Sequence, residues 1–153
     1  MLGRLRSWIG RRVFRARTGC SLTPGEARSP HLEVGRRGEK VAADHLASLG
    51  YRVLFRNLRI GGGELDIVAL HGKTVVFVEV KSRLGESTAA WERIDAKKRR
   101  LLIRAAHTFV RKRSLQECPH RFDVVTVCWP TRNPAETPVV RVYRNAFTDA
   151  RDE

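Results

Sequence analysis

The stretch GELDIVALHGKTVVFVEVKSR, residues 63–83, decides the fold and carries the strongest chemical signal in the chain. Its pattern predicts two strands, Glu64–Leu70 and Thr74–Lys81, which are rich in valine, isoleucine and leucine. His71-Gly72 between them is typical of a tight turn, because glycine accepts the positive φ that short hairpin turns require. The stretch is therefore predicted to be a β-hairpin.

Charged side chains on this hairpin are predicted to share one face. Side chains alternate along a strand, so Glu79 and Lys81 point the same way. A two-residue turn that pairs Leu70 with Lys73 places Asp66 on that face as well. Asp66 and Glu79 are then diagonal neighbours across the two strands, about 7–8 Å apart. One face of the hairpin thus holds two carboxylates and one ammonium group.

The other hairpin residues are mostly apolar, and strands of this kind are usually covered on both faces. Charges on such strands are costly to bury unless they are paired or bind a metal. Two neighbouring carboxylates suit Mg²⁺, which often takes only one or two. Lys81 could then hold a phosphate or a water. The alternative is a partly exposed hairpin with an ordinary Glu79–Lys81 ion pair.

Five segments together resemble a known protein family. They are GRRGEKVAA (35–43), NLR (57–59), GELDIVA (63–69), FVEVKSR (77–83) and RFDVVTV (121–127). In combination they are similar to the YraN-like family of bacterial proteins. Asp66 followed by Glu79-Val80-Lys81 also resembles the D…(D/E)-x-K signature of the restriction-endonuclease-like nucleases, the superfamily that includes archaeal Holliday-junction resolvases.

The resemblance implies a restriction-endonuclease-like αβββαβ core of the α/β class, with a mixed central sheet and helices on both faces. It also implies a catalytic set of Glu39, Asp66, Glu79 and Lys81. Glu39, Asp66, Glu79 and the Val80 carbonyl would hold Mg²⁺ or Mn²⁺, with Glu39 as the glutamate that a helix contributes. Without the resemblance, the favoured interpretation of Glu39 is an exposed glutamate near a helix N-terminus.

The element order predicted from periodicity agrees with that core. Helices are expected at Gly35–Leu49 and at about Trp91–Arg113, and further strands at Tyr51–Leu58, His120–Trp129 and Val139–Tyr143, with a frayed tail from Asn145. Residues 31–153 are expected to form the endonuclease-like domain. Residues 1–30 form a basic arm with seven arginines and one glutamate, either disordered or a basic amphipathic helix.

Net charge narrows the class of partner. The chain carries a formal charge of +14 with a sequence pI near 11.1, so a polyanion is the first partner to consider. Lysines and arginines crowd the second helix, where like charges repel one another. Residues expected to contact nucleic acid, taken to be DNA, are Arg36, Arg37, Arg83, Lys97, Lys98 and Arg100. The three glycines 61–63 could also approach a phosphate backbone closely.

Compartment and membrane association follow from weaker signals. Three scattered cysteines fit a reducing cytoplasm better than a disulfide framework. No apolar run approaches the length of a membrane span, and no signal peptide is predicted. Anionic lipid remains an alternative partner for the basic arm.

The leading hypothesis is a metal-dependent endonuclease acting on DNA, with branched or junction DNA as one candidate substrate. Cutting a four-way junction requires two active sites, so that substrate would imply a homodimer. The alternative is a non-catalytic nucleic-acid-binding protein on a retained nuclease fold. The carboxylate cluster favours the enzyme, because a protein that only binds has no need of carboxylates that repel phosphate.

Overall fold

The computed structural model describes residues 30–85, 95–131, 133 and 136–149. The predictions for the basic arm and for a helix start at about Trp91 concern residues outside these ranges. The elements are α2 (Pro30–Ser48), β1 (Arg52–Ile60), β2 (Gly63–His71), β3 (Thr74–Leu84), α3 (Ala96–Lys112), β4 (His120–Trp129) and β5 (Val139–Phe147). Their order is the predicted αβββαβ, extended by a final strand.

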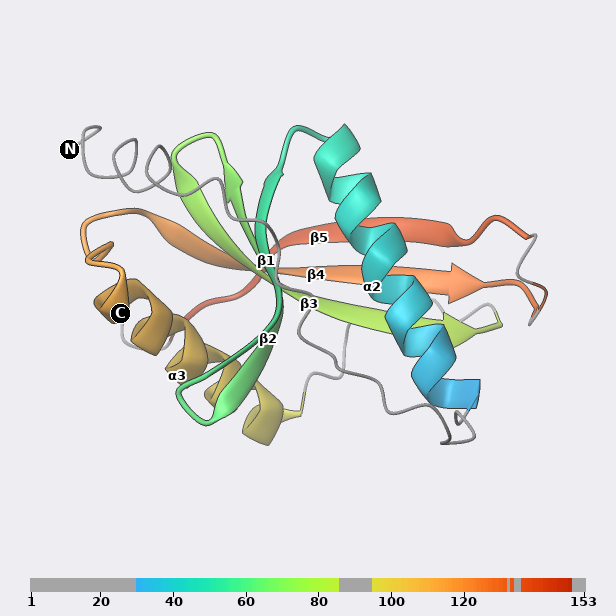
Figure 1. The fold of residues 1–153 in the computed structure, drawn as a ribbon, viewed down its shortest axis with the longest axis horizontal. Helices are drawn as coiled ribbons and strands as arrows, with labels where there is room; N and C mark the ends of the chain where they lie inside the picture. Colours follow the sequence, from blue (N-terminus) through green and yellow to red (C-terminus); the bar gives the residue numbers. More distant parts are fainter. Residues whose placement is uncertain (1–29, 86–94, 132, 134–135, 150–153) are drawn as a thin grey trace, which may run out of the picture.

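Within the described residues the strands form a five-stranded mixed sheet in the order β1-β2-β3-β4-β5. Neighbouring strands are antiparallel except β3 and β4, which are parallel and joined through α3. Figure 1 shows α2 crossing one face of the sheet and α3 lying against the other, beside the β1–β2 hairpin. This is the arrangement expected of a restriction-endonuclease-like core.

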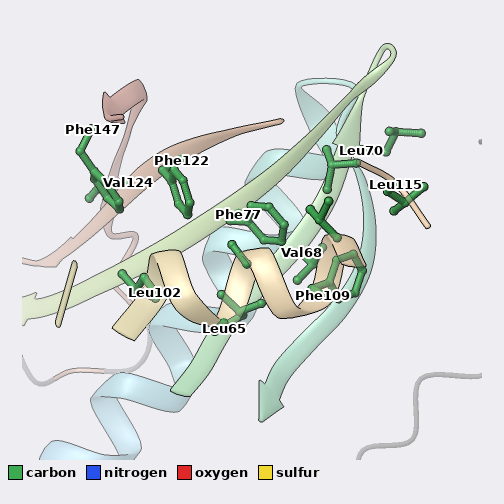
Figure 2. Packing of buried hydrophobic residues seen from close by; sticks show 14 residues of the cluster. Leu65, Val68, Leu70, Phe77, Leu102, Phe109, Leu115, Phe122, Val124 and Phe147 are labelled. Atoms are coloured by element: carbon green, nitrogen blue, oxygen red, sulfur yellow. The ribbon is translucent and has the colours of Figure 1, made fainter. Parts of the chain in front are cut away.

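Alternation along the central strands produces an apolar layer on each face. On β3, Val75 and Phe77 pack toward α3, whereas Val76 and Val78 pack toward α2. Figure 2 shows Phe77 facing α3, where its ring meets the Phe109 ring edge-on at 5.8 Å between centroids. The prediction that both faces of the hairpin are covered is confirmed.

Several predicted boundaries are wrong by a few residues. Helix α2 begins at Pro30 rather than Gly35, because proline is well tolerated in the first turn of a helix. Strand β5 continues to Phe147, so the prediction of a frayed tail from Asn145 is wrong for residues 145–147. The Asn145 backbone N–H donates to the buried carboxylate of Asp123 at 2.9 Å, which fixes this segment.

The hairpin register differs from the expected one. His71 pairs with Thr74 and Leu70 with Val75, so the turn residues are Gly72 and Lys73. Gly72 has φ of 61°, as a turn with glycine at its first central position requires. The register is displaced by two residues, and every side chain therefore keeps its predicted face.

No helix among the described residues is both long enough and apolar enough to cross a bilayer.

Candidate active site

Strands β2 and β3 separate inside the sheet, and the candidate site lies at their point of separation. Their backbone pairing ends at Ile67–Val78, although β2 begins at Gly63 and β3 continues to Leu84. Beyond that pair, β3 stays with β4 as far as Trp129, and β2 stays with β1. Figure 1 shows the β1–β2 hairpin curving toward α3 while β3 runs on beside β4.

Glycines hold the diverging hairpin against α3. A Cβ on Gly63 would lie 3.0 Å from the Leu101 carbonyl oxygen, and one on Gly61 would lie 2.7 Å from the Thr108 hydroxyl. Side chains would therefore prevent this approach. The glycines 61–63, which were considered for a close approach to phosphate, instead lie close to α3. This contact draws β2 away from β3.

Asp66 and Glu79 lie at the point of separation. Continuing the observed register by one step places them opposite each other, rather than diagonally as expected. The Val80 backbone N–H donates to Asp66 Oδ2 at 2.8 Å, so this carboxylate accepts from the strand that β2 is leaving. Glu79 is only 3% exposed, on the side of the sheet that faces α3.

Two lysines contact the Glu79 carboxylate. Lys81 Nζ donates to Oε1 at 2.8 Å, and Lys98 Nζ, from the first turn of α3, lies 3.3 Å from Oε2. The Lys98 approach lacks the geometry of a hydrogen bond, and Oε2 accepts none from any described residue. The Glu79–Lys81 ion pair of the alternative hypothesis is present, but it involves a buried carboxylate rather than an open surface.

The environment of Asp66 disfavours its charge. Burial, followed by the negative charge of Glu79, raises the pKa of Asp66 from its ordinary 3.8 to about 7. The Val80 hydrogen bond and the Lys98 charge act in the opposite direction, whereas Glu39 adds a smaller repulsion. A cation bound between the two carboxylates would relieve this repulsion.

These residues fit a divalent ion with few protein ligands. Glu79 Oε2 is buried without a hydrogen bond, and Asp66 is held beside it. The part of the chain that is described has no group of three His, Cys, Asp or Glu side chains that could hold a metal. Mg²⁺ commonly takes one or two carboxylates and keeps several waters, so Asp66 and Glu79 suit it.

Glu39 lies on α2, half-buried, and the structure does not gather it with the other two carboxylates into one metal-binding group. Its helix is held close to β3 by Gly38, where a Cβ would lie 2.4 Å from Ser82 Cβ. Ser82 Oγ donates to the Val34 carbonyl at 3.0 Å and accepts from Trp129 Nε1 at 2.9 Å. The effect of Glu39 on Asp66 is electrostatic, because its negative charge contributes to the raised pKa of Asp66.

The residues expected to bind nucleic acid separate into two groups. Four of them, Arg36, Arg83, Lys97 and Arg100, are exposed. The guanidinium of Arg37 lies over the Trp129 ring, 4.2 Å from its centroid, and Lys98 points into the site. Sequence reasoning placed Lys98 among the surface lysines and missed its contact with Glu79, since helix periodicity alone does not orient α3 on the sheet.

A second buried carboxylate, Asp123 on β4, belongs to a structural network on the α2 side of the sheet, where it pairs with Val78. Asp123 is fully buried and accepts from Arg121 Nε at 2.9 Å and from the Tyr51 hydroxyl at 3.2 Å. The Asp123 carboxylate is thus paired with an arginine inside the fold.

Comparison with known proteins places these residues in a family. The family model described as uncharacterised protein family UPF0102 matches residues 38–127, more than half of the chain. A UPF0102 protein of Caldicellulosiruptor saccharolyticus is 40% identical over 116 residues, which cover 75% of this chain and 97% of that protein. A UPF0102 protein of Symbiobacterium thermophilum is 42% identical over 115 residues, which cover 74% of this chain and 95% of that protein. A UPF0102 protein of Geotalea uraniireducens is 39% identical over 123 residues, which cover 80% of this chain and 94% of that protein. The chain therefore belongs to the UPF0102 family, the YraN-like proteins.

Proposed function

We propose that this protein is a metal-dependent endonuclease that acts on DNA. The observation that carries the proposal is the site at the β2–β3 separation. Glu79 is buried between two lysines, beside an Asp66 whose charge is disfavoured by burial and by Glu79. Carboxylates in so apolar a sheet are explained by a bound cation better than by fold stability, because an apolar pair of similar volume is often at least as stable.

Asp66, Glu79 and the Val80 carbonyl would hold one or two Mg²⁺ or Mn²⁺ ions. Such an ion would lower the pKa of a bound water and neutralise charge on the scissile phosphate. The chain's own contribution is to fix these oxygens: the Val80 N–H orients Asp66, and Lys81 orients Glu79. Glu39 adds negative charge from α2.

Lys81 is suited to the reacting phosphate. Its side chain is 25% exposed and is held at Glu79 Oε1 by a 2.8 Å hydrogen bond. An ammonium group has three donors, so Lys81 can keep Glu79 in place and still donate to a water or a phosphate oxygen. It would orient the attacking water and stabilise charge that develops on the phosphate. No covalent intermediate is required.

DNA is the proposed substrate because the chain is strongly basic and exposed Lys97 and Arg100 extend from the site along α3. The substrate panel should contain duplex, single-stranded, flap and four-way DNA and duplex RNA, each with Mg²⁺ and with Mn²⁺. Cleavage of the four-way junction would further predict a homodimer, which sedimentation would measure.

Two variants separate an enzyme from a binding protein. Asp66→Asn and Lys81→Ala should each lose about 100-fold or more in cleavage rate. Gel shifts in EDTA should show opposite effects on DNA binding. Asp66→Asn should hold or tighten it, because a charge that repels phosphate is gone, whereas Lys81→Ala should weaken it slightly.

Asp44→Asn is the matched control, since Asp44 is an exposed carboxylate on α2 that pairs with Lys40. It should leave cleavage unchanged. Parental protein that binds DNA tightly but cuts nothing in the whole panel would refute the nuclease proposal and leave a nucleic-acid-binding protein.

A further inference from the structure

Lys98 approaches the Glu79 carboxylate from a different element than Lys81 does. Lys81 lies on the same strand as Glu79, whereas Lys98 lies in the first turn of α3. Their amines contact different oxygens, Lys81 at Oε1 and Lys98 at Oε2. The buried carboxylate thus has one cation from its own strand and one from the helix that crosses the sheet.

The two contacts differ in strength. Lys81 donates a hydrogen bond at 2.8 Å, whereas Lys98 lies at 3.3 Å without one. The Lys98 side chain is also the more exposed, at 38% against 25%. Less burial and poorer geometry both weaken an ion pair. Of the two lysines, Lys98 is the one that is more easily displaced.

The position of Lys98 on its helix supports a role at the site. The first turn of α3 contains no acidic residue, and its N-cap is Asp95, whose carboxylate accepts from the Lys97 N–H. A cation in the first turn lies at the positive end of the helix dipole, where it is disfavoured. The Glu79 carboxylate compensates this locally, so anything that withdraws Oε2 leaves Lys98 in need of another anion.

We propose that Lys98 is a displaceable counter-ion of the active site. It neutralises Glu79 Oε2 in the metal-free protein, and it is released to donate to a phosphate oxygen of DNA when a divalent cation occupies Oε2. The inference rests on the proposed function and deepens it, because it makes metal binding and DNA binding favour each other through one side chain. Such coupling is reciprocal.

The first test measures Mn²⁺ affinity by calorimetry without DNA, in the parent, Lys98→Met and Lys97→Met. Removing a cation next to the metal site should tighten Mn²⁺ binding about tenfold in Lys98→Met. Lys97→Met makes the same change in net charge at an exposed neighbouring position, and it should change the affinity by less than about twofold. Circular dichroism checks the fold, and Lys98→Gln serves if Lys98→Met is unstable.

The second test measures the affinity for labelled duplex DNA in EDTA and in Ca²⁺, which is used as a non-cleaving ion. Lys98→Met should bind only slightly more weakly than the parent in EDTA, where Lys98 is held by Glu79. In Ca²⁺ it should bind about tenfold more weakly than the parent, because a charged phosphate contact is missing. Lys97→Met should weaken binding by the same factor in both conditions.

Failure of this inference is distinguishable from failure of the proposed function. Parental protein that binds Mn²⁺ and cleaves DNA, together with equal Mn²⁺ affinities in the two lysine variants, would overturn only the role of Lys98. A Lys98→Met defect of the same size in EDTA and in Ca²⁺ would do the same, since it would make Lys98 an ordinary surface contact. Parental protein that binds no Mn²⁺ would overturn both.

Discussion

Replacing Asp66 by asparagine should stabilise the fold, and the gain should grow with pH. Asparagine keeps an oxygen that can accept the Val80 N–H, and it removes a carboxylate whose pKa burial and Glu79 raise to about 7. A raised pKa means that the native state binds a proton more tightly than the unfolded chain does. Between about pH 4 and about pH 7 the unfolded state therefore carries fewer protons at this position, and parental stability falls as pH rises.

The magnitude follows from the interval between the ordinary pKa of 3.8 and about 7. Each pKa unit corresponds to about 1.4 kcal/mol, so the full interval corresponds to about 4 kcal/mol. This is an upper limit, since neighbouring side chains in the parent can relax around the charge. We expect Asp66→Asn to gain between about 2 and about 4 kcal/mol over the parent near pH 8, and little near pH 4.

The assay is urea unfolding of both proteins at several pH values from about 4 to about 8, with the difference in unfolding free energy plotted against pH. The plot should rise from about pH 4 and level off above about pH 7. Asp44→Asn, which removes an exposed carboxylate, should show no such rise. A flat plot for Asp66→Asn, or a loss of stability near pH 8, would refute the reasoning that the Asp66 charge is disfavoured in the folded protein.

Two further predictions concern the frame of the site. Gly38→Ala should destabilise the protein by about 1–3 kcal/mol, because a Cβ there would overlap Ser82. Gly35→Ala on the same helix has open space around the new Cβ and should stabilise the protein by about 0.5–1 kcal/mol. Equal urea midpoints for the two variants would contradict this prediction. Asp123→Ala should cost about 3–5 kcal/mol, because it leaves Arg121 beside an empty partner position, and an unchanged thermal midpoint would show that the network is dispensable.

The sequence predicted the order of the elements because each core strand is marked by its own composition. Strand β4 was predicted with its observed limits, since a segment rich in β-branched and aromatic residues follows His120 and is stopped by Pro130. The hairpin register was not predictable, because Gly72 can occupy either central position of a two-residue turn. A shift of two residues preserves the faces, so the shared side of Asp66 and Glu79 was still predicted although the register was wrong.

The separation of β2 from β3 could not be predicted, because it depends on contacts distant in the sequence. Gly61 and Gly63 approach α3 more than thirty-five residues away, and this approach bends the hairpin. The inward direction of Lys98 has the same origin, since the rotation of α3 about its own axis is set by the buried side chains of Leu102, Ala105 and Phe109. Sequence reasoning found the acidic half of the site from strand alternation, but not the lysine that only packing brings to it.

The charges of the site distinguish an enzyme from a binding protein more sharply than net charge does. A strongly basic chain binds polyanions with or without Asp66 and Glu79, and for binding alone both carboxylates are unfavourable, because they repel phosphate. They are also unfavourable for folding, as the raised pKa of Asp66 indicates. Two lysines offset the negative charge while the site lacks a metal. A divalent ion would make the same cluster net positive, and a net positive cluster would attract phosphate. Without a metal, these carboxylates lower the stability of the fold and weaken the binding of phosphate. With a metal bound between them, both effects are reversed, as a metal-dependent nuclease requires.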